Sequence, residues 1–150
     1  MTDERYEFTR VASVVETQAP PSLSFVTDGQ RRVHVGGESV AGTLDMQFVR
    51  TAAAERKPIF IAFDPGSGKL TFAAPFTEDR VRALQPINGS TDLEVTLARR
   101  PAYMRLKGSH PRQIELRRLL ERALSDGERV WIGSFPGDEE ILDARIGPAR

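Results

Sequence analysis

The strongest constraint on the fold is that the chain matches itself. Residues 33–75 align without a gap on residues 104–146, an offset of 71 positions. Six aligned positions are identical, where about two or three are expected by chance for ordinary composition. Apolar positions also fall on apolar positions along the alignment. We therefore predict a tandem duplication, with a first repeat unit in residues 1–76 and a second in residues 77–150.

The clearest helix lies in the second repeat. Apolar side chains between Leu116 and Leu124 recur at the spacing of one helical face, and charged residues occupy the other faces. We expect this helix to begin at Ser109-His110-Pro111, because proline is favoured in a first turn, and to end near Gly127.

The first repeat carries a weaker copy of this helix. The pattern predicts it from about Leu44 to Arg56, and Gly42 disfavours an earlier start. The inward-facing residues are expected to be Leu44, Phe48, Val49 and Ala52.

Short apolar runs bounded by turn residues predict five strands in each repeat. They fall at residues 6–15, 22–26, 32–35, 58–63 and 70–74, and at residues 81–87, 93–97, 102–106, 129–133 and 141–146. The fold class is thus α+β and mostly β, with the order β-β-β-α-β-β twice. This order is similar to the OB-fold, a five-stranded Greek-key barrel. This element order fits either two small barrels or one pseudo-two-fold domain in which the two halves exchange strands. Because the connection between the halves is short, we expect them to be rigidly joined in both cases.

Composition excludes several classes of function. The chain has no cysteine, which excludes disulfides, thiolate metal sites and thiol nucleophiles. No segment has the length and apolarity of a signal peptide core or a membrane span. We therefore expect a cytoplasmic protein that needs no cofactor and does not insert into membranes. A formal net charge of zero argues against a domain built wholly around a polyanion.

Sequence motifs for catalysis are incomplete. Gly66-Ser-Gly-Lys69 lacks the earlier glycine and the following hydroxyl residue of a phosphate loop, and Gly133-Ser-Phe-Pro-Gly137 fails the pattern of a nucleophile elbow. His34 and Glu38 are four residues apart, but His34 lies on an expected strand and no third ligand is near, so no metal site is expected. Asp138-Glu-Glu140 reads as a solvated hairpin tip. An enzyme is not favoured, although a site assembled only by the fold remains an alternative.

Charge distribution gives the one informative asymmetry. Residues 99–122 contain eight basic residues against two acidic ones, whereas residues 126–143 contain six acidic residues and one basic residue. Strand alternation places Met104 and Leu106 in the core and Tyr103, Arg105 and Lys107 on the outer face. Aromatic and basic side chains together are what single-stranded nucleic acid binding uses. Further residues of this candidate surface are Arg99 and Arg100, with Arg32 and His34 as a thinner version in the first repeat.

Three functions from different classes follow. The first is a non-catalytic binding or assembly module that acts through protein association, either with a partner or as a homo-oligomer, since small strand-rich units leave open edges. The second is single-stranded nucleic acid binding through the basic and aromatic strand face. The third is an enzyme whose site forms only in three dimensions.

Overall fold

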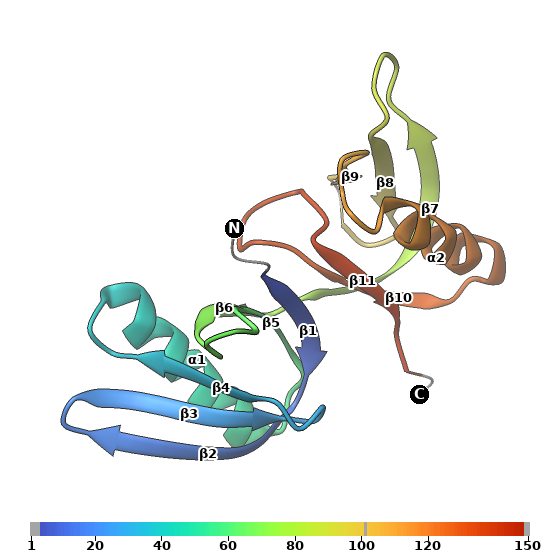
Figure 1. The fold of residues 1–150 in the computed structure, drawn as a ribbon. Helices are drawn as coiled ribbons and strands as arrows, with labels where there is room; N and C mark the ends of the chain where they lie inside the picture. Colours follow the sequence, from blue (N-terminus) through green and yellow to red (C-terminus); the bar gives the residue numbers. More distant parts are fainter. Residues whose placement is uncertain (1–3, 101, 149–150) are drawn as a thin grey trace. The chain divides into compact units, whose positions relative to one another are not determined.

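The computed structural model describes residues 4–100 and 102–148. The ends of the two expected repeats, residues 1–3 and 149–150, lie outside the described residues. The chain divides into two compact units, Met1–Pro75 and Phe76–Arg150, which are described separately. The fold is α+β and mostly β, with one helix in the described part of each unit (Figure 1). Within the described residues, neither helix is long and apolar enough to cross a membrane.

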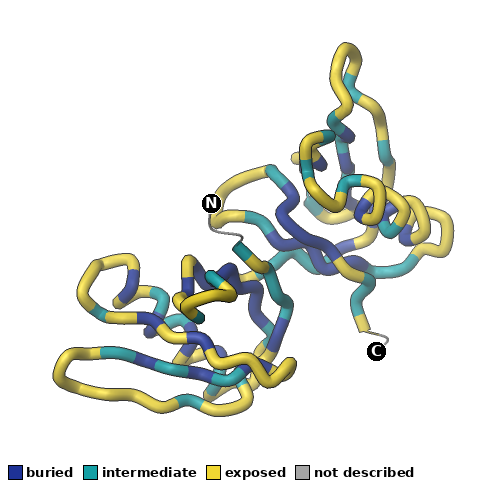
Figure 2. Tube along the Cα trace, in the orientation of Figure 1, coloured by how far each residue is buried: buried dark blue, intermediate teal, exposed yellow. Residues whose placement is uncertain are grey.

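The described residues of the first unit, 4–75, form seven helices and strands. They are β1 (Arg5–Thr9), β2 (Val11–Gln18), β3 (Pro21–Thr27), β4 (Arg32–Gly36), α1 (Val40–Glu55), β5 (Ile59–Phe63) and β6 (Leu70–Ala74). They form two antiparallel sheets with the orders β1-β5-β6 and β2-β3-β4. The single strand expected at residues 6–15 is wrong, because the chain leaves one sheet at Arg10 and enters the other. The turn between β2 and β3 is exposed (Figure 2).

Helix α1 begins earlier than the sequence pattern predicts. The side chain of Ser39 accepts the N–H of Gly42 at 2.9 Å, which caps the helix ahead of Val40. A Cβ on Gly42 would lie 2.0 Å from the carbonyl oxygen of Gly36. Gly42, which by its low helix propensity disfavours an earlier start, is therefore required by a close backbone approach in the first turn.

The core of the first unit lies between α1 and strands from both sheets. Met46, Val49 and Ala52 are the buried apolar residues of the helix, and Phe48 packs partly against the same cluster. Leu44, expected to face inward, is 59% exposed. The inward face is rotated away from Leu44 because Met46 occupies the core position. On the sheets, the cluster comprises Leu23, Phe25, Val33, Val35, Ile59, Ile61, Phe63, Leu70 and Ala73.

The second unit has six helices and strands in residues 76–100 and 102–148. They are β7 (Thr77–Pro86), β8 (Leu93–Leu97), β9 (Met104–Leu106), α2 (Gln113–Asp126), β10 (Arg129–Gly133) and β11 (Asp143–Ile146). One sheet holds all five strands in the order β11-β10-β7-β8-β9. Strand β7 is long enough to pair with β10 through its first half and with β8 through its second.

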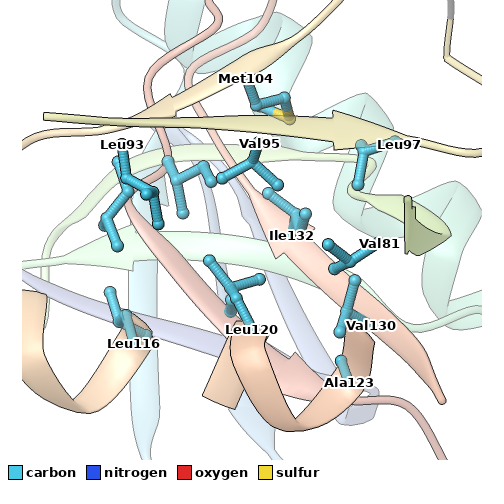
Figure 3. Packing of buried hydrophobic residues seen from close by; sticks show 13 residues of the cluster. Val81, Leu93, Val95, Leu97, Met104, Leu116, Leu120, Ala123, Val130 and Ile132 are labelled. Atoms are coloured by element: carbon cyan, nitrogen blue, oxygen red, sulfur yellow. The ribbon is translucent and has the colours of Figure 1, made fainter. Parts of the chain in front are cut away.

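Helix α2 covers the core of this sheet. Leu116, Leu120 and Ala123 face strand residues such as Val95 and Ile132, and all five side chains are buried (Figure 3). The helix begins at Gln113 and not at Ser109-His110-Pro111, where the chain forms turns. It ends at Gly127, whose φ of 66° closes the helix in the left-handed region.

The strand pairings of the two units correspond. Ile61 pairs with Ala73 in the first unit, and Ile132 pairs with Ala144, each 71 positions later, in the second. The irregularity between Val11 and Ser13 recurs 70 positions later between Val81 and Ala83. The left-handed residue that ends α1 is Arg56, which lies 71 positions before Gly127.

In the part of the chain that the structure describes, none of the three sheets is closed into a barrel by its strand ladders. Each unit has, in addition, one isolated parallel bridge. His34 of β4 is bridged to Lys69, and Arg105 of β9 is bridged to Glu140. In both units the strand just before the helix, β4 or β9, therefore touches the segment that leads into the last strand.

Candidate functional site

The basic and aromatic surface expected on the second unit lies along β9. Met104 and Leu106 are fully buried, and Arg105 between them is half-buried. Tyr103, which lies just before the strand, is 39% exposed, and Lys107 after it is exposed. The alternation thus directs Tyr103, Arg105 and Lys107 away from the core.

Acidic residues surround these cations. Glu94 of β8 lies opposite Arg105 in the antiparallel pairing, and Glu140 is bridged to Arg105 on its other side. The Nζ of Lys107 lies 3.5 Å from Oε1 of Glu140, and the Nε of Arg105 is shielded from solvent. The acidic segment that ends at Glu140 therefore lies against β9 and reduces the positive potential there.

Arg99 and Arg100 follow β8 and are held through their backbones. The carboxylate of Asp79 accepts the N–H of Arg99 at 3.0 Å and that of Arg100 at 3.2 Å. Nη1 of Arg100 lies 3.5 Å from Oγ1 of Thr77 and 3.7 Å from Sδ of Met104, which turns this side chain toward its own sheet. Arg99 lines a small cavity of about 180 Å³ together with Asp79.

The corresponding face of the first unit differs in charge. Ser24 pairs with His34, and His34 is bridged to Lys69, so these three residues form one row across the sheet. The same row in the second unit is Glu94, Arg105 and Glu140. A neighbouring row contains Arg32 paired with Val26. We call Ser24, Arg32, His34 and Lys69 the basic strand face.

The outward side of the β2-β3-β4 sheet, which includes the basic strand face, carries no acidic residue at the positions that pair between strands. Its outward residues on β2, β3 and β4 are Ser13, Val15, Thr17, Ser22, Ser24, Val26, Arg32, His34 and Gly36. The nearest acidic residues in the sequence, Asp28, Glu38 and Asp64, belong to the flanking turns and loops. Arg32, His34 and Lys69 are all exposed.

His34 is held in place by the loop that precedes β6. Its Nε2 donates to the carbonyl oxygen of Ser67 at 2.9 Å, and its backbone N–H donates to the carbonyl of Gly68 at 2.9 Å. Gly68 has a φ of 74°, a conformation that glycine adopts without strain. The loop therefore fixes the imidazole and brings Lys69 beside it.

A second group of titratable side chains, which the sequence pattern did not reveal, lies at the start of α2. Nδ1 of His110 accepts the N–H of Arg112 at 2.9 Å, and its Nε2 donates to the carbonyl of Leu142 at 2.8 Å. Arg112 also contacts Oδ1 of Asp143 at 2.9 Å. Burial raises the pKa of Asp143, although hydrogen bonds from Ala144 and Arg112 act in the opposite direction.

The hydrogen bonds of this group hold the start of α2 in place, and they occupy the atoms that could otherwise react. Both ring nitrogens of His110 are occupied, and Oδ1 of Asp143 accepts from Arg112 and from the Ala144 N–H. Among the residues that the structure describes, no cluster of histidine and acidic side chains could hold a metal ion.

No protein-family model, curated protein or solved structure matches this chain. The arrangement of the residues is thus the basis for any functional assignment.

Proposed function

We propose that this chain is a non-catalytic assembly module made of two related OB-like units, and that it acts by protein association through an open strand edge. The relation between the units is supported by their common strand registers and by the two parallel bridges at positions 71 apart. A homo-oligomer and a cytoplasmic location belong to this proposal.

The OB-like part of the proposal is supported by the order of pairing. In the second unit, β7 pairs with β8, β8 with β9 and β10 with both β11 and β7. The bridge between Arg105 and Glu140 links β9 to the segment before β11. The pairings thereby run around the unit in a ring, as expected of a small, partly open barrel with Greek-key connections.

The observation that carries the association proposal is the free edge of β2. Within the described residues, this eight-residue strand pairs with β3 alone, so its other edge offers unpaired backbone groups. Val15, at its centre, is 66% exposed. Along this edge, Val11–Gln18, there is no lysine, arginine or proline, the residues that commonly protect an edge.

The corresponding stretch of the second unit is better protected. The second half of β7 carries Arg82 and ends at Pro86. In β2 the single charge, Glu16, lies on the face shared with Leu23 and is bound to Arg50 of α1. The exposed face of β2 is therefore uncharged, which favours the addition of a strand from a second copy of the chain.

The experiment is a mass measurement by sedimentation equilibrium at ~50 μM protein. We expect wild type to form a symmetric dimer through antiparallel β2 strands. The double variant Val15→Lys, Thr17→Lys should be a monomer, because the lysines of two antiparallel β2 strands would repel one another across the dimer contact. Gln85→Lys, at the position of β7 that corresponds to Val15, is the matched control and should leave the dimer intact. A monomeric wild type, or a dimeric double variant, would overturn the proposal.

A further inference from the structure

We propose that the basic strand face of the first unit binds the phosphate backbone of a single-stranded nucleic acid. This surface is distinct from the β2 edge, because Arg32, His34 and Lys69 lie on β4 and on the loop before β6. The inference therefore does not depend on protein association.

The cations are arranged to follow an extended chain. Arg32 and His34 are two residues apart on one face of β4, which places them about 6.8 Å apart along the strand. Lys69 lies beside His34 across the parallel bridge. Two permanent positive charges and an imidazole thus share one exposed surface, and Ser24 adds a hydroxyl group that can donate to a phosphate oxygen.

The imidazole of His34 provides a surface for a base. The bond from Nε2 to the Ser67 carbonyl holds the ring in one position, and the residue is exposed. Histidine and arginine both stack on unpaired bases of single strands. Stacking requires accessible base faces, so these groups favour a single strand over a duplex.

The two units provide an internal comparison of charge. In the row formed by Ser24, His34 and Lys69, no carboxylate opposes an incoming phosphate. In the corresponding row of the second unit, Arg105 lies between Glu94 and Glu140. A polyanion is attracted by the first arrangement and repelled by the carboxylates of the second. We therefore place the site on the first unit, although the sequence shows more basic residues in the second.

The test is fluorescence anisotropy with a labelled 12-nucleotide single strand of mixed sequence at ~50 mM salt. Wild type should bind, and log affinity should fall with log salt with a slope of about −1.4 if Arg32 and Lys69 each neutralise one phosphate. Arg32→Ala with Lys69→Ala should weaken binding at least tenfold and flatten the slope. His34→Ala should weaken binding about fivefold or more with the slope unchanged.

Two matched variants remove a positive charge elsewhere. Lys57→Ala changes an exposed lysine of the same unit beyond the end of α1, and Arg105→Ala changes the second unit. Both should bind within twofold of wild type. Circular dichroism melting checks that all variants are folded, and their mass should equal that of wild type, which separates this test from the test of association.

Three results would overturn the inference. The first is no binding by wild type at ~50 mM salt, where electrostatic attraction is still strong. The second is an equal loss in Arg105→Ala and in the Arg32 and Lys69 double variant. The third is equal affinity for a duplex of the same sequence or for vesicles with anionic lipid, since stacking on His34 requires unpaired bases.

Discussion

The carboxylate of Asp79 accepts the backbone N–H of Arg99, with 3.0 Å between Oδ2 and the nitrogen. In the first unit, Oγ1 of Thr9 accepts the N–H of Asp28 at 3.0 Å. Both acceptors are polar side chains buried at the ends of the strand segments that pair with β5 and β10. A buried polar side chain therefore ties the same turn in both units, and their sequences differ at every one of these positions.

Asp79→Ala should destabilise the second unit by about 2–3 kcal/mol, because the partly buried N–H groups of Arg99 and Arg100 would lose their acceptor, the buried carboxylate of Asp79. Urea unfolding followed by the fluorescence of Trp131, the only tryptophan, measures this loss. Thr9→Val in the first unit is the comparison, and it should leave the Trp131 transition unchanged. A loss below about 0.5 kcal/mol in Asp79→Ala would show that water replaces the carboxylate.

Substitutions at the residues that end the two helices should change stability in opposite directions. Arg56 ends α1 with a φ of 55°, and Gly127 ends α2 with a φ of 66°. Left-handed backbone costs a residue with a side chain about 1 kcal/mol relative to glycine. We expect Arg56→Gly to stabilise its unit by about that amount and Gly127→Arg to destabilise the other. Thermal unfolding of each variant checks the signs, and two changes of the same sign would contradict the argument.

Much of the secondary structure could be predicted from the sequence because its causes are local. The expected strands at residues 70–74, 93–97 and 129–133 coincide with β6, β8 and β10. β6 and β10 are mostly apolar runs, and β8 alternates apolar residues with Glu94 and Thr96. The start of α1 could not be predicted, because Gly42 is unfavourable in a helix unless a close approach of other backbone, here the carbonyl of Gly36 six residues earlier, requires it.

The candidate site was harder to predict, because strand pairing determines which charges lie on it. The sequence shows Arg105 and Lys107 in a basic stretch, but the carboxylate of Glu140 is 33 residues away from Lys107 in the sequence and 3.5 Å away in space. Lys69 belonged to a string that resembles a phosphate loop, so its place beside His34 was missed. The alignment of residues 33–75 on residues 104–146 contained this information, since it places Lys69 on Glu140 and so predicts opposite charges at the same position of the two aligned segments.

The buried carboxyl group of Asp143 predicts a pH dependence of stability. Burial raises its pKa in the folded state, so the folded protein retains a proton that the unfolded chain releases near pH 4. The contribution of Asp143 to stability therefore falls as pH rises from about 4 through the folded-state pKa. Asp143→Asn should reduce this fall, because asparagine can still accept from Arg112 and Ala144 without a charge.

Denaturant unfolding at a series of pH values from 3.5 to 8, a range set by the ordinary pKa of aspartate near 3.9, measures the Asp143→Asn effect. Asp138→Asn is the control, because this exposed side chain accepts the N–H groups of Glu139 and Glu140 in a turn, as asparagine also can. The control should follow the wild-type curve. If Asp143→Asn has the same dependence of stability on pH as wild type, Asp143 has the same pKa in the folded and unfolded states and the prediction is wrong.

For the substitution of Gly42 by alanine, helix propensity and steric contact predict opposite changes in stability. In an ordinary helix, replacing glycine with alanine stabilises by about 1 kcal/mol. Here the added Cβ would lie 2.0 Å from the backbone oxygen of Gly36, a contact that only a shift of the helix start can relieve. We expect Gly42→Ala to destabilise the first unit by at least about 2 kcal/mol, a size typical of overpacking. Gly36→Ala is the control, because a Cβ there meets no atom within 4 Å, and its effect should be small. Thermal unfolding of both variants decides the matter. If Gly42→Ala raises the melting temperature, helix propensity outweighs the contact, and the approach of Gly36 to α1 is not what fixes the start of the helix.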